Sequence, residues 1–224
     1  AHHYNFPRCA MLPRSVVGLT AAEIRLAAGI GDREIDCVFG GPPCQGFSMI
    51  GQRVLDDPRN QLVLEFVRIV RDLGAKSFVF ENVKGLTVGQ HRAFLYELIE
   101  AFGNAGYEVT SPWQVLNAAN FGVPQSRERL IIMGVRRGLE CPSYPSSLTA
   151  APGKVKAGTL PLGPTCADAL DDLPNADDFA TLNKSDAVRT ARFGVPSAYA
   201  AELRCIEGHG WHFGYVRSWE QDVL

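Results

Sequence analysis

The segment IDCVFGGPPCQGFS at residues 35–48 gives the clearest signal of the fold. Its first five residues are mostly apolar, which predicts a short buried strand. The glycines and prolines at 40–43 end that strand abruptly. Cys44 is therefore expected at a strand end and outside the core, because the two glycines permit close backbone approach and the two prolines stiffen the turn.

The segments on either side of this strand predict helices. Upstream, Thr20 and Glu23 form a capping-box pattern before a short helix that glycines stop near residue 30. Downstream, a second helix is expected from the cap Asp57, with Pro58 in its first turn, to Gly74. Its apolar residues recur at helical spacing, so one face of it should be buried.

The rest of the chain continues this alternation of strands and helices. The predicted elements are a strand at 77–80 closing at 81–82, a helix at 91–102 broken by Gly103 and Gly106, an extended segment at 107–116, a strand at 130–135, and short helices at 166–173 and 197–204. Such alternation predicts the α/β class, with a parallel or mixed sheet covered by helices. Pro, Gly and Ser become frequent after residue 136, so we expect a first domain at 1–136 and a linker with the start of a small second domain at 137–224.

Composition and charge exclude several classes of protein. The 224 residues are 46% hydrophobic, enough for one domain or one domain plus part of another. No apolar run approaches the roughly 18 residues of a transmembrane helix, and no secretory signal pattern occurs. The formal net charge of −2 does not by itself indicate a nucleic-acid binder. The six cysteines are scattered without a C-x-x-C pair, which favours a reduced, cytoplasmic protein.

Three polar or reactive groups fall at strand ends, where open α/β sheets bind ligands. A lone cysteine such as Cys44 is more often a small buried apolar residue, but its turn favours the partial exposure that a nucleophilic thiolate needs. Glu81 directly follows an apolar run, and is either a functional acid or an ordinary cap or solvated strand end. Arg127 and Arg129 precede the last strand, where a surface salt-bridge cluster is the simpler interpretation. Together, a cysteine, an acid and two arginines suit nucleophilic attack on a polarised ring or acyl group.

Other motifs give no competing site. Five histidines show neither a Cys/His nucleophilic arrangement nor zinc-ligand spacing, and GHGWH at 208–212 is interpreted as loop or interface, so no metal is expected. The phosphate-binding patterns G-x-x-x-x-G-K and G-x-G-x-x-G do not occur.

At this point the sequence resembles the DNA cytosine-5 methyltransferase family. The matching stretches are GGPPCQGFS at 40–48, DDPRNQLVLEFVRIV at 56–70, ENV at 81–83 and NFGVPQSRERL at 120–130, with weaker matches at 5–7 and 167–174. They extend from about residue 5 to 204. PPCQ, ENV and Q-x-R-x-R in this order, each at a predicted strand end, form a highly specific set. The resemblance implies an S-adenosylmethionine-dependent, Rossmann-like sheet with flanking helices, incomplete here, followed by the start of a target-recognition region.

The resemblance also implies a catalytic mechanism. The Cys44 thiolate would attack ring carbon 6 of a cytosine flipped out of duplex DNA, so that carbon 5 takes the methyl group of S-adenosylmethionine. Glu81 would bond ring N3 and the exocyclic amine. Arg129, with Arg127, would hold the ring O2 and the cysteine loop, and Asn82 would orient the loop backbone.

Further residues are assigned binding roles through the same resemblance. Gln45 and Ser48 belong to a segment similar to the family's mobile loop over DNA, and Gln125 is placed with them as a DNA contact. Pro43 and Leu62 match positions that touch the cofactor. The expected partner is double-stranded DNA, and the expected setting is the prokaryotic cytoplasm, associated with the nucleoid, within restriction–modification.

The sequence also departs from the family pattern. The N-terminal F-x-G-x-G cofactor loop and the acid that binds the cofactor ribose are absent, and Ser15 stands where the family has an Asp for the adenine amine. The chain starts at Ala1 rather than Met. These departures leave open an alternative: a catalytically inactive fragment, or a split-enzyme subunit whose partner chain supplies cofactor and DNA binding. RNA methylation by the same thiol chemistry ranks lower, because Gly46-Phe47-Ser48 resembles the DNA enzymes, and a Cys-dependent hydrolase ranks lowest.

Overall fold

The computed structural model describes residues 6, 8–43, 60–89, 91–151, 160–185, 187–190 and 192–203. The chain divides into two compact units: Ala1–Leu116 with Glu128–Ser146, and Asn117–Arg127 with Ser147–Leu224. The functional division at residue 136 stays a prediction. None of the helices in the described ranges is long and apolar enough to cross a membrane.

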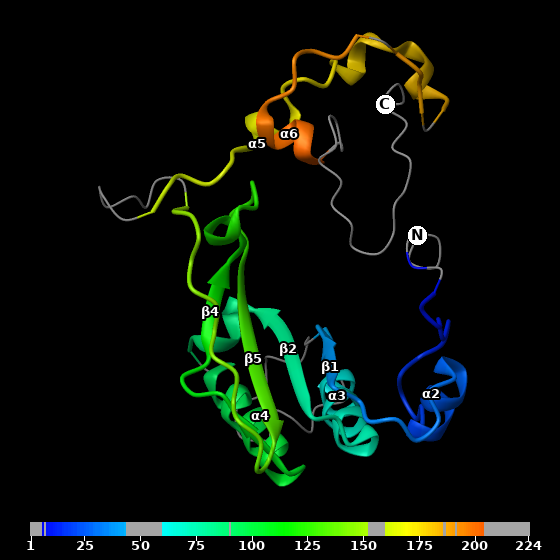
Figure 1. The fold of residues 1–224 in the computed structure, drawn as a ribbon, viewed down its shortest axis with the longest axis vertical. Coiled ribbons are helices and arrows are strands. Elements are labelled where there is room, and N and C mark those ends of the chain that lie inside the picture. The colour runs from blue at the N-terminus through cyan, green and yellow to red at the C-terminus, as the bar shows by residue number, and fades with distance from the viewer. Residues whose placement is uncertain are drawn as a thin grey trace. The chain divides into compact units, whose positions relative to one another are not determined.

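The first unit is built on a mixed β-sheet (Figure 1). Its strands are β1 (Cys37–Gly40), β2 (Ser77–Val83), β3 (Tyr107–Val109), β4 (Gln114–Asn117) and β5 (Glu128–Arg136), in the order β1-β2-β5-β3, with β4 also pairing with β5. β1 runs parallel to β2, whereas β5 runs antiparallel to β2 and β3. The predicted α/β class with a parallel or mixed sheet is confirmed. The direction of β5 places its first residues at the edge where β1 and β2 end.

Two helices, α3 (Gln61–Leu73) and α4 (His91–Asn104), pack on one face of this sheet (Figure 1). Alternate residues of a strand share a face, so Phe78 and Phe80 of β2 both point toward the helices. Phe78 stacks on Phe102 of α4 with ring centroids 3.9 Å apart. Phe80 lies edge-on to Phe66 of α3 at 5.5 Å. These aromatic contacts join both helices to β2 in one core.

One of the predicted helix starts is confirmed. The capping box holds: the Thr20 side chain accepts a bond from the Glu23 backbone at the start of α2 (Ala21–Ala28), and Gly29 ends this helix at φ 63°. Helix α3 begins at Gln61, with Asn60 as its N-cap. The predicted cap Asp57 and Pro58 lie outside the described residues.

The predicted break at Gly103 was wrong, because α4 continues to Asn104. The buried apolar face of α4, which includes Phe102, outweighs the weak helix preference of one glycine. The turn is made instead by Gly106, whose φ of 93° suits glycine. The segment predicted as extended at 107–116 forms β3 and β4 with a gap between them.

Polar residues that the sequence places just outside the strands lie within them. β2 continues through Glu81 and Asn82 to Val83, and β5 starts at Glu128 instead of residue 130. The ladder between them pairs Val83 with Arg129 and Glu81 with Ile131. These polar residues stay in the sheet because their backbone groups are paired there.

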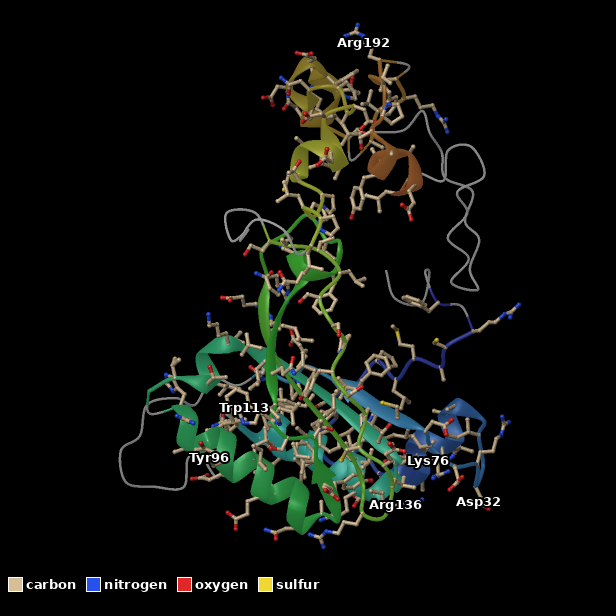
Figure 2. The ribbon with its side chains drawn as sticks, turned by 60° about the vertical axis from the view of Figure 1, so that its left-hand side comes forward. Asp32, Lys76, Tyr96, Trp113, Arg136 and Arg192 are labelled. Carbon is tan, nitrogen blue, oxygen red and sulfur yellow. The ribbon has the colours of Figure 1, made fainter. Side chains whose placement is uncertain are left out.

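The opposite end of this sheet carries an exposed ion-pair cluster. Lys76 Nζ lies 3.1 Å from Glu34 Oε2 and 2.9 Å from Asp36 Oδ1, and Arg136 Nη2 lies 3.7 Å from Glu34 Oε1. Figure 2 shows Lys76 and Arg136 at the same end of the sheet. Since these groups are exposed, water screens their attraction and the cluster contributes little to stability.

In the described part of the second unit, all the helices are short. They are η4 (Ala118–Phe121), α5 (Cys166–Leu170), η5 (Ala176–Asp178), η6 (Ala180–Asn183) and α6 (Ala198–Leu203). Thr165 and Asp168 form a capping box at α5, and the Ser197 hydroxyl, just before α6, donates to the Asp168 carbonyl. The two short helices expected from the sequence are confirmed in position, although both are shorter than predicted.

Candidate functional site

Side chains predicted to be functional meet at the edge where β1 and β2 end and β5 begins. Glu81 and Arg129 lie on the same face of the sheet, because Glu81 pairs with Ile131 and residues two apart along a strand share a face. Arg129 Nε lies 2.9 Å from Glu81 Oε1. The Glu81 side chain keeps 37% of its surface exposed. The carboxylate is therefore held by a cation and still open to a ligand.

Asn82 points to the other face of β2 and fixes the loop after β1. The residue is 6% exposed, and its Nδ2 donates to the Pro42 carbonyl at 3.0 Å. Its Oδ1 accepts from the Val83 backbone N–H at 2.9 Å. Asn82 thus ties the last residues before Cys44 to β2, as the role of loop orientation requires.

Gly41 lies in contact with the Glu81 carboxylate. A Cβ atom at position 41 would sit 2.7 Å from Glu81 Oε2 and 3.4 Å from the Glu81 carbonyl oxygen. Such a distance is shorter than van der Waals contact, so a side chain larger than hydrogen would displace the carboxylate. The glycine is needed here for close approach, not for a special backbone conformation.

We expect Gly41→Ala to impair the site more than the fold. The added methyl group should push Glu81 away from Arg129. A displacement of about 1 Å in a catalytic group costs roughly 10- to 100-fold in rate. Methyl transfer to DNA measures the first effect and thermal unfolding the second. Gly85→Ala is the matched control, because a Cβ there meets only Val83 Cγ2, at 3.9 Å. Equal rates for the two variants would contradict this role of Gly41.

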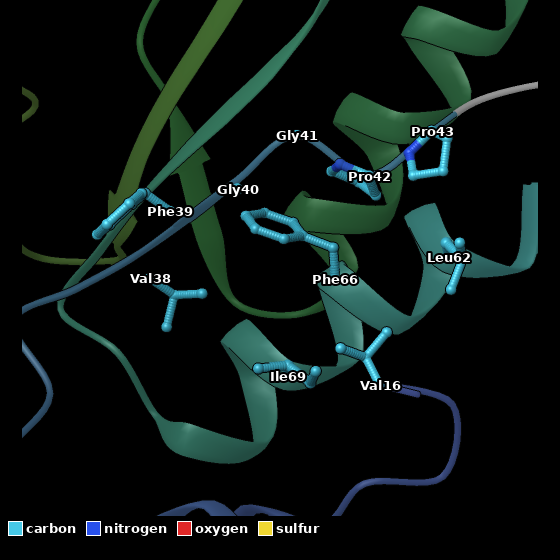
Figure 3. A pocket seen from close by; sticks show the side chains of 10 residues that line it. All are labelled: Val16, Val38, Phe39, Gly40, Gly41, Pro42, Pro43, Leu62, Phe66 and Ile69. Atoms are coloured by element: carbon cyan, nitrogen blue, oxygen red, sulfur yellow. The ribbon is translucent and has the colours of Figure 1, made fainter. Parts of the chain in front are cut away.

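A pocket of about 390 Å³ lies beside this edge, between the end of β1 and helix α3 (Figure 3). Pro43 and Leu62, both predicted to touch the cofactor, line it. The remaining lining residues are Val16, Val38, Phe39, Gly40, Gly41, Pro42, Phe66 and Ile69. The walls are almost wholly apolar side chains, with glycine and proline backbone at one end.

Ser15, the third predicted cofactor residue, does not line this pocket. Its side chain is exposed, and its Oγ accepts from the Val17 N–H at 3.1 Å. The neighbouring Val16 lines the pocket in its place. The role given to Ser15 stays a prediction.

The other predicted residues lie in the second unit or outside the described residues. Gln125 and Arg127 belong to the second unit, where both side chains are exposed. The Arg127 backbone is fixed there, its N–H donating to Asn117 Oδ1 at 3.0 Å. Cys44, Gln45 and Ser48 lie outside the described residues, immediately after Pro43. Their roles stay predictions.

Comparison with known proteins identifies the family. A family model described as C-5 cytosine-specific DNA methylase matches residues 19–191, most of the chain. The chain belongs to the C-5 cytosine-specific DNA methylase family.

Individual methylases support this assignment. The type II methyltransferase M.XorII of Xanthomonas oryzae pv. oryzae is 52% identical over 224 residues, which make up 100% of this chain and 50% of that protein. The type II methyltransferase M.AquIA of Picosynechococcus sp. is 45% identical over 141 residues, covering 60% of this chain and 57% of that protein. The chain thus spans about half the length of the curated relatives it matches.

A solved methylase structure supports the fold. It belongs to a prophage-encoded protein of E. coli, assigned as a DNA modification methyltransferase, with a TM-score of 0.59 and 30% sequence identity. The match covers 78% of this chain and 45% of that one. The mixed sheet with flanking helices is therefore the Rossmann-like α/β fold of S-adenosylmethionine-dependent methyltransferases.

Most of the pocket wall was not among the residues predicted from the sequence. Phe66 and Ile69 were interpreted only as part of a buried helix face. The available signal was their spacing from Leu62, since positions four and seven residues apart fall on one side of a helix. Val16 gave no such signal, because it lies in an irregular segment. Among the described residues, no group of three or more His, Cys, Asp or Glu side chains could hold a metal ion.

Proposed function

We propose that this chain carries the catalytic site of a DNA cytosine-5 methyltransferase that modifies double-stranded DNA, in the type II restriction–modification setting of its relatives. The observation that carries the proposal is the Glu81–Arg129 pair, held at 2.9 Å beside the loop that leads into Cys44. Family membership and the order of PPCQ, ENV and Q-x-R-x-R support the same reaction.

The Glu81 carboxyl group suits recognition of a flipped cytosine. Its exposed fraction allows it to bond ring N3 and the exocyclic amine, a pattern that distinguishes cytosine from thymine. Arg129 holds one carboxyl oxygen, and its proposed second role is to bond the ring O2 of the same base. The ion pair therefore fixes the Glu81 carboxyl group before the cytosine binds. Less free energy is then needed to order this side chain in the transition state.

Cys44 is the proposed nucleophile. Its thiolate would add to ring carbon 6, which makes carbon 5 nucleophilic toward the methyl group that S-adenosylmethionine would supply, leaving S-adenosylhomocysteine. Removal of the carbon 5 proton then expels the thiolate and restores the ring. Asn82 supports this step by holding the Pro42 carbonyl, two residues before the thiol.

The pocket beside α3 suits the methyl donor. Its apolar walls fit the adenine ring of S-adenosylmethionine, and its volume lies in the range of small-molecule sites. Pro43 and Leu62 would contact the donor there, and the glycines at 40–41 permit close approach of its polar parts. When bound, S-adenosylmethionine supplies the methyl group.

The test is covalent trapping on DNA. Duplex DNA of mixed sequence carrying 5-fluorocytosine is incubated with the protein and S-adenosylmethionine, because fluorine blocks the final proton removal. Mass spectrometry should find protein joined to DNA for the wild type and none for Cys44→Ser. Cys37→Ser is the matched control, since Cys37 is an exposed thiol on β1 outside the proposed mechanism.

Each other outcome has a definite meaning. A wild-type adduct that persists in Cys44→Ser would overturn the role of Cys44. No wild-type adduct would contradict activity of this chain alone, as expected of an inactive fragment or a subunit that needs a partner chain. An adduct with fluorinated RNA but not DNA would favour the RNA alternative.

A further inference from the structure

A short turn that forms one wall of the pocket is tied to helix α3 by polar contacts. The turn comprises residues 15–19, in which the Leu19 N–H donates to the Val16 carbonyl at 3.1 Å. Gly18 has a φ of 72°, and a Cβ added there would meet nothing within 4 Å. The space around Gly18 is therefore open, and close packing at this position does not hold the turn. The buried Leu19 fixes only its last residue.

Two charged residues of α3 bond the backbone of this turn. Glu65 Oε2 accepts from the Gly18 N–H at 3.2 Å. Arg68 Nη2 donates to the Leu19 carbonyl at 2.7 Å and to the Val16 carbonyl at 3.4 Å. One N–H and two carbonyls of the turn are thus bound by Glu65 and Arg68. These residues are three apart in sequence and therefore lie on the same face of α3.

Glu65 and Arg68 also hold each other in place. Arg68 Nη2 and Nε lie 2.6 and 3.0 Å from Glu65 Oε2, and Arg68 Nη1 lies 3.0 Å from Asp72 Oδ2. The Glu65 bond raises the pKa of Arg68 above its ordinary value, so the guanidinium stays charged. With side-chain exposures of 24% and 15%, Arg68 and Glu65 are better shielded than surface ion pairs.

The contacts of Glu65 and Arg68 with the turn affect the pocket through Val16. Val16 lines it together with Leu62 and Ile69 of the same helix, as Figure 3 shows. Neither Glu65 nor Arg68 is among the lining residues. Any effect of these two side chains on a ligand is therefore indirect, and the turn they hold is one route for it.

We propose that Glu65 and Arg68 are positioning residues for cofactor binding, which hold the turn at residues 15–19 so that Val16 closes the pocket against α3. The inference rests on the proposed function of this pocket. Without these bonds the turn would sample other positions, and binding would cost the free energy needed to order it again. The expected effect falls on affinity for the methyl donor and not on the chemical step.

The test measures binding of S-adenosylhomocysteine by calorimetric titration of the protein. Arg68→Gln should weaken binding about 10-fold, because it removes the bonds to both carbonyls and releases Glu65. In methylation assays its KM for S-adenosylmethionine should rise by a similar factor, with kcat at saturating donor within about twofold of wild type. Arg68→Lys keeps the charge but not the forked geometry, and should lose about threefold.

The matched control is Arg71→Gln on the same helix. Arg71 is 58% exposed and pairs with Asp72, without a bond to the turn. Its binding should equal that of the wild type. Equal affinities of the Arg68 and Arg71 variants would overturn the inference alone. Failure of the wild type to bind S-adenosylhomocysteine would instead overturn the proposed function of the pocket. If Arg68→Gln does not fold, Arg68→Lys decides the question by the same comparison.

Discussion

Replacing Glu81 by glutamine should lower the rate of DNA methylation by at least about 100-fold. The change keeps the size of the side chain and removes its charge and acid function, which in proton-transfer catalysis contribute roughly 100- to 10,000-fold. It also weakens the 2.9 Å ion pair with Arg129. Initial rates of methyl transfer to DNA at saturating S-adenosylmethionine measure the loss.

The loss should appear without a loss of fold or of cofactor affinity. Glu81 is not among the residues that line the pocket, so binding of S-adenosylhomocysteine should stay within about twofold of wild type. Glu108→Gln is the matched control, since Glu108 is an exposed acid on β3 of the same sheet. If Glu81→Gln retained more than a tenth of the wild-type rate, the proposed role in base recognition would be wrong.

Truncating Phe102 to alanine should destabilise the protein by about 3 to 5 kcal/mol, the usual cost of removing a fully buried aromatic ring. Phe102 has no exposed surface and contacts both Phe78, at 3.9 Å between ring centroids, and Phe66, at 6.3 Å. For a protein of this size the loss corresponds to a fall in Tm of roughly 6 to 20 °C. Thermal unfolding followed by circular dichroism measures it.

Tyr96→Ala provides the comparison on the same helix. Tyr96 is 52% exposed, and its ring lies under the Arg92 guanidinium at 5.6 Å. Its removal should shift Tm by no more than about 3 °C, because a half-exposed ring loses little buried area. Similar shifts for the two variants would show that Phe102 does not hold α4 to the sheet as the contacts indicate.

Most of the local structure could be predicted from the sequence, because local signals control it. The capping box of Thr20 and Glu23 sets the start of α2, and the apolar run at 77–80 forms the buried part of β2. Predictions failed where packing competed with a local preference. Gly103 stays inside α4 because the neighbouring Phe102 is buried.

The family, the α/β class and the residue types of the candidate site follow from the sequence alone, since they depend on order and spacing along the chain. Which of these residues meet depends on the tertiary structure. The antiparallel pairing of β5 with β2 brings Arg129 to Glu81, 48 positions earlier in the chain, and no local signal specifies that direction. The need for glycine at 41 and the place of Val16 in the pocket were decided in the same way. Both depend on contacts between segments distant in sequence, and such contacts exist only once the sheet and α3 have packed.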